Sequence, residues 1–175
     1  MSKRFSELKF EEWIEHSLLQ EGYNDSFTHS NELSSKYDKE YCLIPETLLE
    51  FIKTTQKEEY DKLEVNSGGN PDSQILKRVS EQISTKGIVD VLREGIQTKG
   101  SKFELVYFQP KSSLNQDHLN LYQQNHFTVV RQLHYSTKNN NSLDMVIFIN
   151  GIPIVTMELK NQLTGQNIKD SEYQY

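Results

Sequence analysis

The last third of the chain contains two apolar runs that are separated by only two residues. The runs extend from 143 to 149 and from 152 to 159, and Asn150-Gly151 lies between them. Asn-Gly is a strong hairpin signal, because both residues accept the positive φ angles of a tight turn. Neither run alternates between apolar and polar residues, so we expect both strands to be covered on both faces. A buried hairpin is therefore the element around which the rest of the chain must fold.

The first hundred residues are typical of a series of helices. Apolar residues recur there at helical spacing, with expected stops at Gly22, at 67–71 and at Gly87. Pro45 and Pro71 stand where the first turns of two helices would begin. On the first, amphipathic helix the residues at helical spacing are Phe10, Trp13, Ile14, Ser17 and Leu18.

From residue 103 the pattern changes from helices to strands. Residues 103–108 are strand-like, and 127–135 alternate as a half-buried strand does. The polar stretch 24–39 has no periodicity, and we interpret it as loop. Together with the hairpin, these segments predict an α/β fold with a mixed central sheet flanked by helices. We interpret 1–175 as one domain, with a helical part to residue 100 and the sheet from 101.

Composition narrows the class of protein. The one cysteine, Cys42, excludes an internal disulfide and a Cys-based zinc site. No apolar run approaches the ~20 residues of a membrane span, and the start lacks the apolar core of a signal peptide. We therefore expect a cytoplasmic protein without a membrane partner.

The net charge of −6 argues against a stand-alone DNA binder. Either another domain or subunit delivers nucleic acid, or this acidic domain never meets DNA.

Three charged residues stand in or directly beside the two apolar runs. Asp144 lies near the start of the first run, and Glu158 and Lys160 lie at the end of the second. Glu158 and Lys160 are two residues apart, so they share one face of a strand. Two carboxylates can hold a hard cation such as Mg²⁺, and an amine beside them can stabilise charge on a phosphate. This set suits phosphodiester hydrolysis. Alternatively, the three are strand-end charges that meet solvent.

The strand register makes this site testable. A two-residue turn would set Asp144 opposite Met157, and Asp144 and Glu158 would then point to opposite faces of the sheet. A shared cation site needs the pairing shifted by one residue. We therefore expect either a three-residue loop, 150–152, or a distortion beside Asp144.

The segment FTVVRQLHYSTKNNNSLDMVIFINGIPIVTMELKN, residues 127–161, resembles the nuclease domain of the R subunit of type I restriction–modification enzymes. The NGIP turn leading into ELKN is its most specific part, and 87–95 and, more loosely, 13–23 are also similar. The resemblance implies a PD-(D/E)xK restriction-endonuclease-like core. It implies that Asp144 and Glu158 bind Mg²⁺, for which Mn²⁺ can substitute, with the backbone carbonyl of Leu159 as a further ligand. It also implies that Lys160 is the catalytic lysine.

The same resemblance implies a Mg-dependent, type I site-specific deoxyribonuclease that cleaves double-stranded DNA together with modification and specificity subunits. In similar nucleases a glutamate of an early helix approaches the metal, and Glu15 is the candidate here. Gln174 fits the first position of the family's QxxxY motif, whose tyrosine would lie beyond Tyr175. The chain has no GxxxxGK[ST] loop, so ATP would act only through a motor elsewhere.

We therefore expect an amino-terminal piece of a larger motor subunit. The alternative to a nuclease is a non-catalytic docking or DNA-binding module of the same fold.

Overall fold

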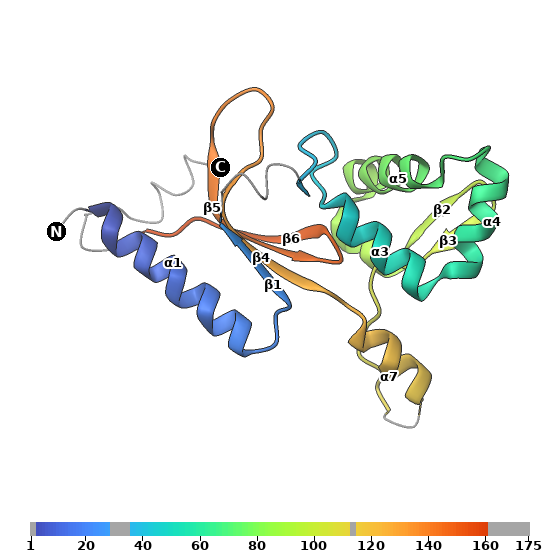
Figure 1. The fold of residues 1–175 in the computed structure, drawn as a ribbon, viewed down its shortest axis with the longest axis horizontal. Helices are drawn as coiled ribbons and strands as arrows, with labels where there is room; N and C mark the ends of the chain where they lie inside the picture. The colour runs from blue at the N-terminus through green and yellow to red at the C-terminus, as the bar shows by residue number, and fades with distance from the viewer. Residues whose placement is uncertain (1–2, 29–35, 113–114, 161–175) are drawn as a thin grey trace. The chain divides into compact units, whose positions relative to one another are not determined.

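The computed structural model describes residues 3–28, 36–112 and 115–160 (Figure 1). It combines helices with strands, which confirms the predicted α/β class. The chain divides into two compact units. Unit 1 comprises Met1–Ser35, Phe127–Phe148 and Pro153–Tyr175, and unit 2 comprises Lys36–His126 and Ile149–Ile152. Among the described helices, none has the length and apolar character needed to cross a membrane.

Unit 1 is built on a sheet whose strands follow the order β1-β4-β5-β6. The sheet and the helix beside it consist of α1 (Lys3–Gln20), β1 (Asp25–Thr28), β4 (Phe127–His134), β5 (Ser142–Ile149) and β6 (Ile152–Met157). β1 pairs with β4 in parallel, whereas the two-residue connection makes β5 and β6 an antiparallel hairpin. The sheet is therefore mixed, as predicted.

β1 lies inside the stretch that the sequence indicated to be loop, so that interpretation is wrong for residues 25–28. Its pairing partner, β4, is about a hundred residues away in the chain. The backbone N–H of Asn24 donates to the Phe127 carbonyl at 2.9 Å, and the Asn24 side chain accepts from the Phe127 N–H at 2.8 Å. A polar segment becomes a strand here because a distant strand satisfies its backbone groups.

The face of α1 that is buried is not the face on which the sequence places its large aromatic residues. Ile14 and Leu18 pack against a core of Val129, Met145 and Ile147. Phe10 and Trp13 are instead 48% and 64% exposed, and their rings stack on each other with centroids 6.2 Å apart. The face that α1 buries is therefore the one that carries Glu11, Ile14 and Leu18, three residues that follow each other at helical spacing.

The hairpin has a two-residue turn. Asn150 and Gly151 both have positive φ, 49° and 77°, as Asn-Gly predicts. The expected three-residue loop, 150–152, is therefore wrong. The turn belongs to unit 2, where Gly151 O accepts from the Ile44 N–H at 2.8 Å. A Cβ atom on Gly151 would run into the Ile44 carbonyl.

Asn150 is fully buried at this turn and all its side-chain groups are hydrogen-bonded. Its Oδ1 accepts from the His126 N–H at 2.7 Å. Its Nδ2 donates to the Leu105 carbonyl at 2.9 Å and to Asn125 Oδ1 at 3.0 Å. Asparagine therefore has two roles at this position. It tolerates the left-handed backbone conformation, and its side chain bonds to backbone groups of neighbouring segments.

The two hairpin strands differ in burial. The residues Met145–Ile149 of β5 are all buried, as expected for a strand covered on both faces. β6 does not meet that expectation: Val155 is 41% exposed. The reason is position, because β5 lies between two strands while β6 ends the order of the described sheet.

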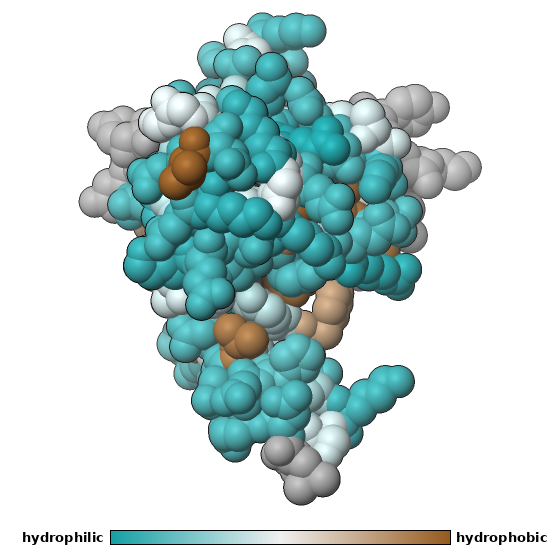
Figure 2. Space-filling model, turned by 90° about the vertical axis from the view of Figure 1, so that its right-hand side faces the viewer, coloured by the Kyte–Doolittle hydropathy of each residue, from teal (hydrophilic) through white to brown (hydrophobic). Residues whose placement is uncertain are grey.

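Unit 2 is a helical layer around a two-stranded antiparallel sheet. Its elements are α3 (Pro45–Thr55), α4 (Lys57–Ser67), α5 (Pro71–Lys86), α6 (Ile88–Glu94), β2 (Ile96–Thr98), β3 (Ser101–Phe103) and α7 (Gln116–Gln123). Pro45 and Pro71 open their helices as predicted, and Asn70 caps α5 by accepting from the Ser73 N–H at 3.3 Å. The face drawn in Figure 2 is mostly hydrophilic, with hydrophobic residues in small separate patches.

Residues 104–108 are not a strand, so that prediction is wrong. Side-chain amides take the place of a neighbouring strand. Gln56 donates to the Glu104 carbonyl at 2.8 Å and accepts from its N–H at 2.7 Å. Asn125 likewise donates to the Tyr107 carbonyl at 2.7 Å and accepts from the Tyr107 N–H at 3.2 Å. Apolar composition alone predicted a strand, but the backbone partners of this segment are side chains.

Candidate active site

β4 contains one residue with an unusual backbone conformation, Gln132, next to the predicted site. Gln132 has φ 53°, a left-handed conformation that a bulky residue rarely adopts and that costs about 1–3 kcal/mol. In a regular strand, successive side chains point to opposite faces. Here both Arg131 and Gln132 contact α1, through Glu15 and Glu11 respectively. The positive φ thus breaks the alternation of β4 and turns two neighbouring side chains towards one helix.

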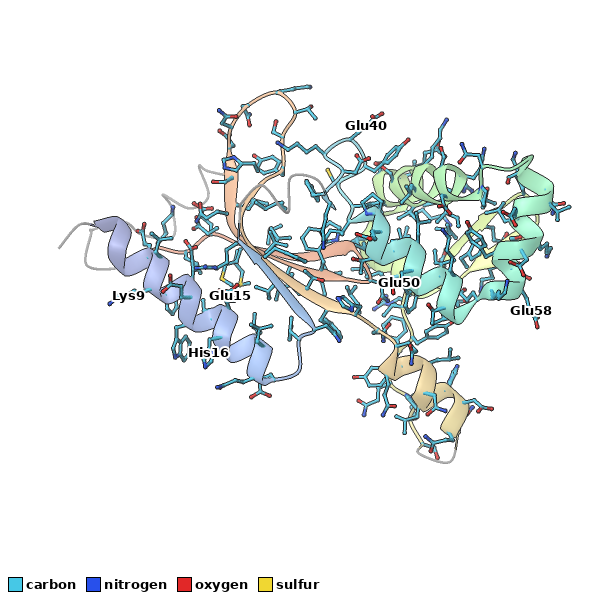
Figure 3. All side chains as sticks on the ribbon, in the orientation of Figure 1. Lys9, Glu15, His16, Glu40, Glu50 and Glu58 are labelled. Carbon is cyan, nitrogen blue, oxygen red and sulfur yellow. The ribbon has the colours of Figure 1, made fainter. Side chains whose placement is uncertain are left out.

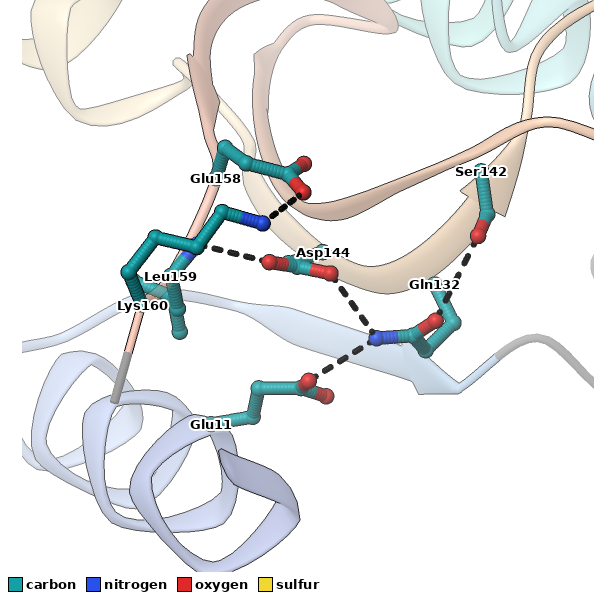
Figure 4. A network of polar contacts seen from close by, with 7 residues as sticks. All are labelled: Glu11, Gln132, Ser142, Asp144, Glu158, Leu159 and Lys160. Atoms are coloured by element: carbon teal, nitrogen blue, oxygen red, sulfur yellow. Dashed lines mark hydrogen bonds and ion pairs between the residues drawn. The ribbon is translucent and has the colours of Figure 1, made fainter. Parts of the chain in front are cut away.

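Gln132 connects two acidic residues from different elements (Figure 4). Its Nε2 donates to Glu11 Oε1 of α1 at 2.8 Å and, with a longer bond of 3.3 Å, to Asp144 Oδ1 of β5. Its Oε1 accepts a long hydrogen bond of 3.4 Å from the Ser142 hydroxyl. One amide therefore holds together carboxylates that are 133 residues apart in the sequence.

The second oxygen of Asp144 reaches the end of β6. Asp144 Oδ2 accepts from the Leu159 N–H at 2.6 Å. β6 ends at Met157, the residue that a two-residue turn sets opposite Asp144. Beyond this point the chain leaves the strand, and the Asp144 side chain takes the Leu159 N–H in place of a strand partner. An unusual backbone at Gln132 of β4 and the end of β6 thus lie next to Asp144, while the shifted β5–β6 pairing that a shared cation site needs stays a prediction.

Glu158 and Lys160 form an ion pair in the same place. Lys160 Nζ lies 2.9 Å from Glu158 Oε1, and the side chains are only 16% and 12% exposed. Figure 4 draws this pair next to the contact between Asp144 and Leu159. A pair that is so shielded from water interacts more strongly than a surface ion pair. The three residues singled out in the sequence, Asp144, Glu158 and Lys160, therefore lie in one polar network of unit 1.

Glu11 adds a third carboxylate to this network. It is 2% exposed, and its Oε2 is buried without a hydrogen-bond partner among the described residues. Burial raises the pKa of Glu11, the hydrogen bond from Gln132 opposes this rise, and the charge of Asp144 raises the pKa further. A buried carboxylate oxygen without a partner is costly unless a proton or a cation neutralises it.

Glu15, the helical glutamate that the sequence suggested, is engaged elsewhere. Its carboxylate lies 3.0 Å from Nε of Arg131, and both side chains are largely buried. The pair is close in distance, although Arg131 Nε has no well-aligned hydrogen bond. Glu12 also approaches Arg131, at 3.9 Å. Figure 3 shows Glu15 on the strand side of α1, while Lys9 and His16 point away. Gln174 lies outside the described residues.

The donor chemistry of the network suits a hard divalent cation. Its acidic oxygens come from Glu11, Asp144 and Glu158, and oxygen ligands are what Mg²⁺ and Mn²⁺ prefer. The network drawn in Figure 4 contains three carboxylates and one ammonium group, that of Lys160, and the charge of Arg131 also acts on Glu11. In residues 3–28, 36–112 and 115–160, no group of three or more His, Cys, Asp or Glu side chains is placed so that it could hold a metal ion. A cation here would also need backbone, water or substrate oxygens.

Sequence reasoning missed Glu11 and Gln132. A signal for Glu11 was available, because a charged residue at helical spacing with Ile14 and Leu18 lies on a buried face. No such signal existed for Gln132, whose role depends on a positive φ in the middle of a strand. That conformation is decided by contacts with α1 and β5, which are distant in the sequence.

A comparison with protein families identifies one that spans almost the whole chain. The family described as "Type I restriction enzyme R protein N terminus (HSDR_N)" matches residues 4–175. No curated protein matches the chain, and no solved structure does. The match includes α1, the strands β4 to β6 and residues 158–160 that follow them, which together contribute every residue of the polar network. The chain therefore belongs to the family of type I restriction enzyme R protein N termini.

Proposed function

We propose that the chain is a magnesium-dependent endonuclease domain with a PD-(D/E)xK core, the cleavage module of a type I restriction enzyme. It would act on double-stranded DNA, within a larger ATP-driven subunit and together with modification and specificity subunits. The observation that carries the proposal is the shielded acid–acid–lysine network of Asp144, Glu158 and Lys160. A docking module has no need for such a set, because buried charges cost free energy that apolar residues would not.

Each residue has a role that follows from its contacts. Asp144 and Glu158 would hold the cation with the Leu159 carbonyl. Asp144 is oriented for this by its bonds from Gln132 and the Leu159 N–H. Glu11, rather than Glu15, is the helical glutamate of the site, because only its Oε2 is buried without a partner. The proposal requires the carboxylates of Asp144 and Glu158 to lie within about 6 Å, so that each can reach one cation at about 2 Å.

Lys160 would stabilise charge on the phosphate. Its ammonium is held by Glu158 at 2.9 Å in a site with little solvent, where a positive charge acts strongly on a phosphate that enters. When bound, Mg²⁺ would supply Lewis-acid chemistry towards that phosphate. The backbone contact at Leu159 keeps Glu158 and Lys160 beside Asp144.

The test compares variants in the complete restriction complex and in this chain. Lys160→Ala should abolish DNA cleavage by the complex and leave ATP hydrolysis intact, since ATP chemistry lies outside this chain. Asp144→Ala should remove Mn²⁺ binding to the chain in calorimetric titrations. Lys102→Ala, which removes an exposed ion pair in unit 2, is the matched control and should leave both unchanged. Normal cleavage by Lys160→Ala would instead favour a docking or DNA-binding module.

A further inference from the structure

We propose that Gln132 is the positioning residue of the acidic site: its amide sets the placement of the Glu11 and Asp144 carboxylates. The role of Gln132 as a support for a cation rests on the proposed function. Its role in placing the two acids does not. Gln132 Nε2 donates to Glu11 at 2.8 Å and, through a longer bond of 3.3 Å, to Asp144.

The chemistry of an amide suits this task. A side-chain NH₂ group has two N–H donors, so one nitrogen can serve one carboxylate with each. An amide is also neutral. Lysine or arginine at this position would bring the acids together too, but would cancel the negative charge that a cation needs. Glutamine gathers two carboxylates and leaves their charge available.

The nitrogen and the oxygen of the amide can be assigned from the contacts. Carboxylate oxygens accept hydrogen bonds only, so the end of Gln132 that faces Glu11 and Asp144 must be the NH₂ group. The opposite end faces the Ser142 hydroxyl, which donates to Oε1 at 3.4 Å. Ser142 and Asp144 both belong to β5, so Gln132 is fixed by contacts on the same strand that carries the acid.

The backbone supports the same conclusion. Gln132 keeps an unfavourable left-handed φ of 53° in a strand whose other described residues do not have positive φ. With regular strand geometry its side chain would point away from the helix that Arg131 contacts. Strained conformations of this kind persist where surrounding contacts over-determine them, and they cluster at functional sites. The contacts available to do this are those with Glu11, Asp144 and Ser142.

Two variants distinguish the effect of losing the amide from the effect of the backbone strain. Gln132→Gly removes the amide and fits a positive φ without strain. Gln132→Leu removes the amide and retains both the side-chain bulk and the strain. Gln97→Leu, at an exposed position of β2, is the control for replacing a strand glutamine. All are made in the full 175-residue chain.

The first measurement is thermal melting in EDTA, as a double-mutant cycle of Gln132→Gly with Asp144→Ala. If Gln132 holds Asp144, the loss in melting temperature from Gln132→Gly becomes smaller in the Asp144→Ala background. Additive losses would show that the two side chains do not interact and would overturn the inference. No metal is involved, so this outcome is independent of the proposed nuclease activity.

The second measurement is calorimetric titration with Mn²⁺. Supporting groups that orient a metal ligand typically change metal affinity 10–100-fold when removed. We expect Kd to rise by about this factor in both Gln132→Gly and Gln132→Leu, and to stay unchanged in Gln97→Leu. Wild-type affinity in Gln132→Gly would mean that the amide positions nothing, and would overturn the inference. If the wild-type chain itself binds no Mn²⁺, the proposed metal site fails, and the cycle in EDTA alone decides the role of Gln132.

Discussion

Replacing Glu11 by glutamine should stabilise the protein when no cation is present and make its stability less sensitive to Mn²⁺. Glu11 Oε1 accepts from Gln132, and a glutamine oxygen can do the same. Oε2 is buried without a partner in the described part of the chain. A buried polar group in this state costs about 1–3 kcal/mol, and a charged one more. Glu11→Gln removes this charge while keeping nearly the same shape.

The effect should depend on pH in a defined direction. The pKa of Glu11 is raised above its ordinary value of 4.5, mainly by burial. Below pH 4.5 the carboxyl is protonated in both the folded and the unfolded chain, so it does not disfavour folding. As the pH rises, the unfolded chain loses this proton first, and the folded state loses stability until its own pKa is passed. The melting temperature of Glu11→Gln should therefore equal that of the wild type near pH 4 and exceed it at neutral pH.

The assay is thermal melting in EDTA and in excess Mn²⁺. A gain of about 1–3 kcal/mol corresponds to roughly 2–12 °C for a chain of this length. In the wild type, Mn²⁺ at a hundredfold excess over Kd should add about 2.7 kcal/mol, and in Glu11→Gln clearly less. The neighbouring Glu12, whose side chain is 61% exposed, provides the control Glu12→Gln, for which we expect little change.

A Glu11→Gln protein that is less stable than the wild type in EDTA at neutral pH would refute this reasoning. It would mean that the Glu11 carboxylate already has a favourable partner in the folded chain.

Two further predictions concern the hairpin turn in unit 2. Asn150→Asp should lower stability by about 2–4 kcal/mol in urea unfolding, because an oxygen would replace the Nδ2 that donates to Leu105 and Asn125; an unchanged midpoint would contradict the buried network. Gly151→Ala should destabilise by at least about 1 kcal/mol, since alanine must adopt φ 77° and meet the Ile44 carbonyl; Gly100→Ala, with positive φ but open space, should cost less.

Local patterns identified those elements of the fold that short-range physics controls. Pro45, and Pro71 with the Asn70 cap, began helices where expected, because capping and a fixed φ act within one turn. Asn150-Gly151 formed the predicted turn for the same reason. Patterns failed where the partner lies far away in the chain. β1 became a strand because it pairs with β4. Residues 104–108 did not become a strand, because the side chains of Gln56 and Asn125 bond to their backbone groups.

The sequence by itself singled out the acid–acid–lysine set of the candidate site, and the tertiary structure decided which contacts these residues make. Asp144, Glu158 and Lys160 were recognisable because charges in apolar strands are costly and need a reason. The sequence could not tell which glutamate of α1 contacts Asp144's partner Gln132, since Glu11 and Glu15 lie one turn apart and only the packing of α1 separates them. It also could not reveal Gln132, because a positive φ within β4 is a compromise between local strain and contacts that form only when α1, β4 and β5 come together.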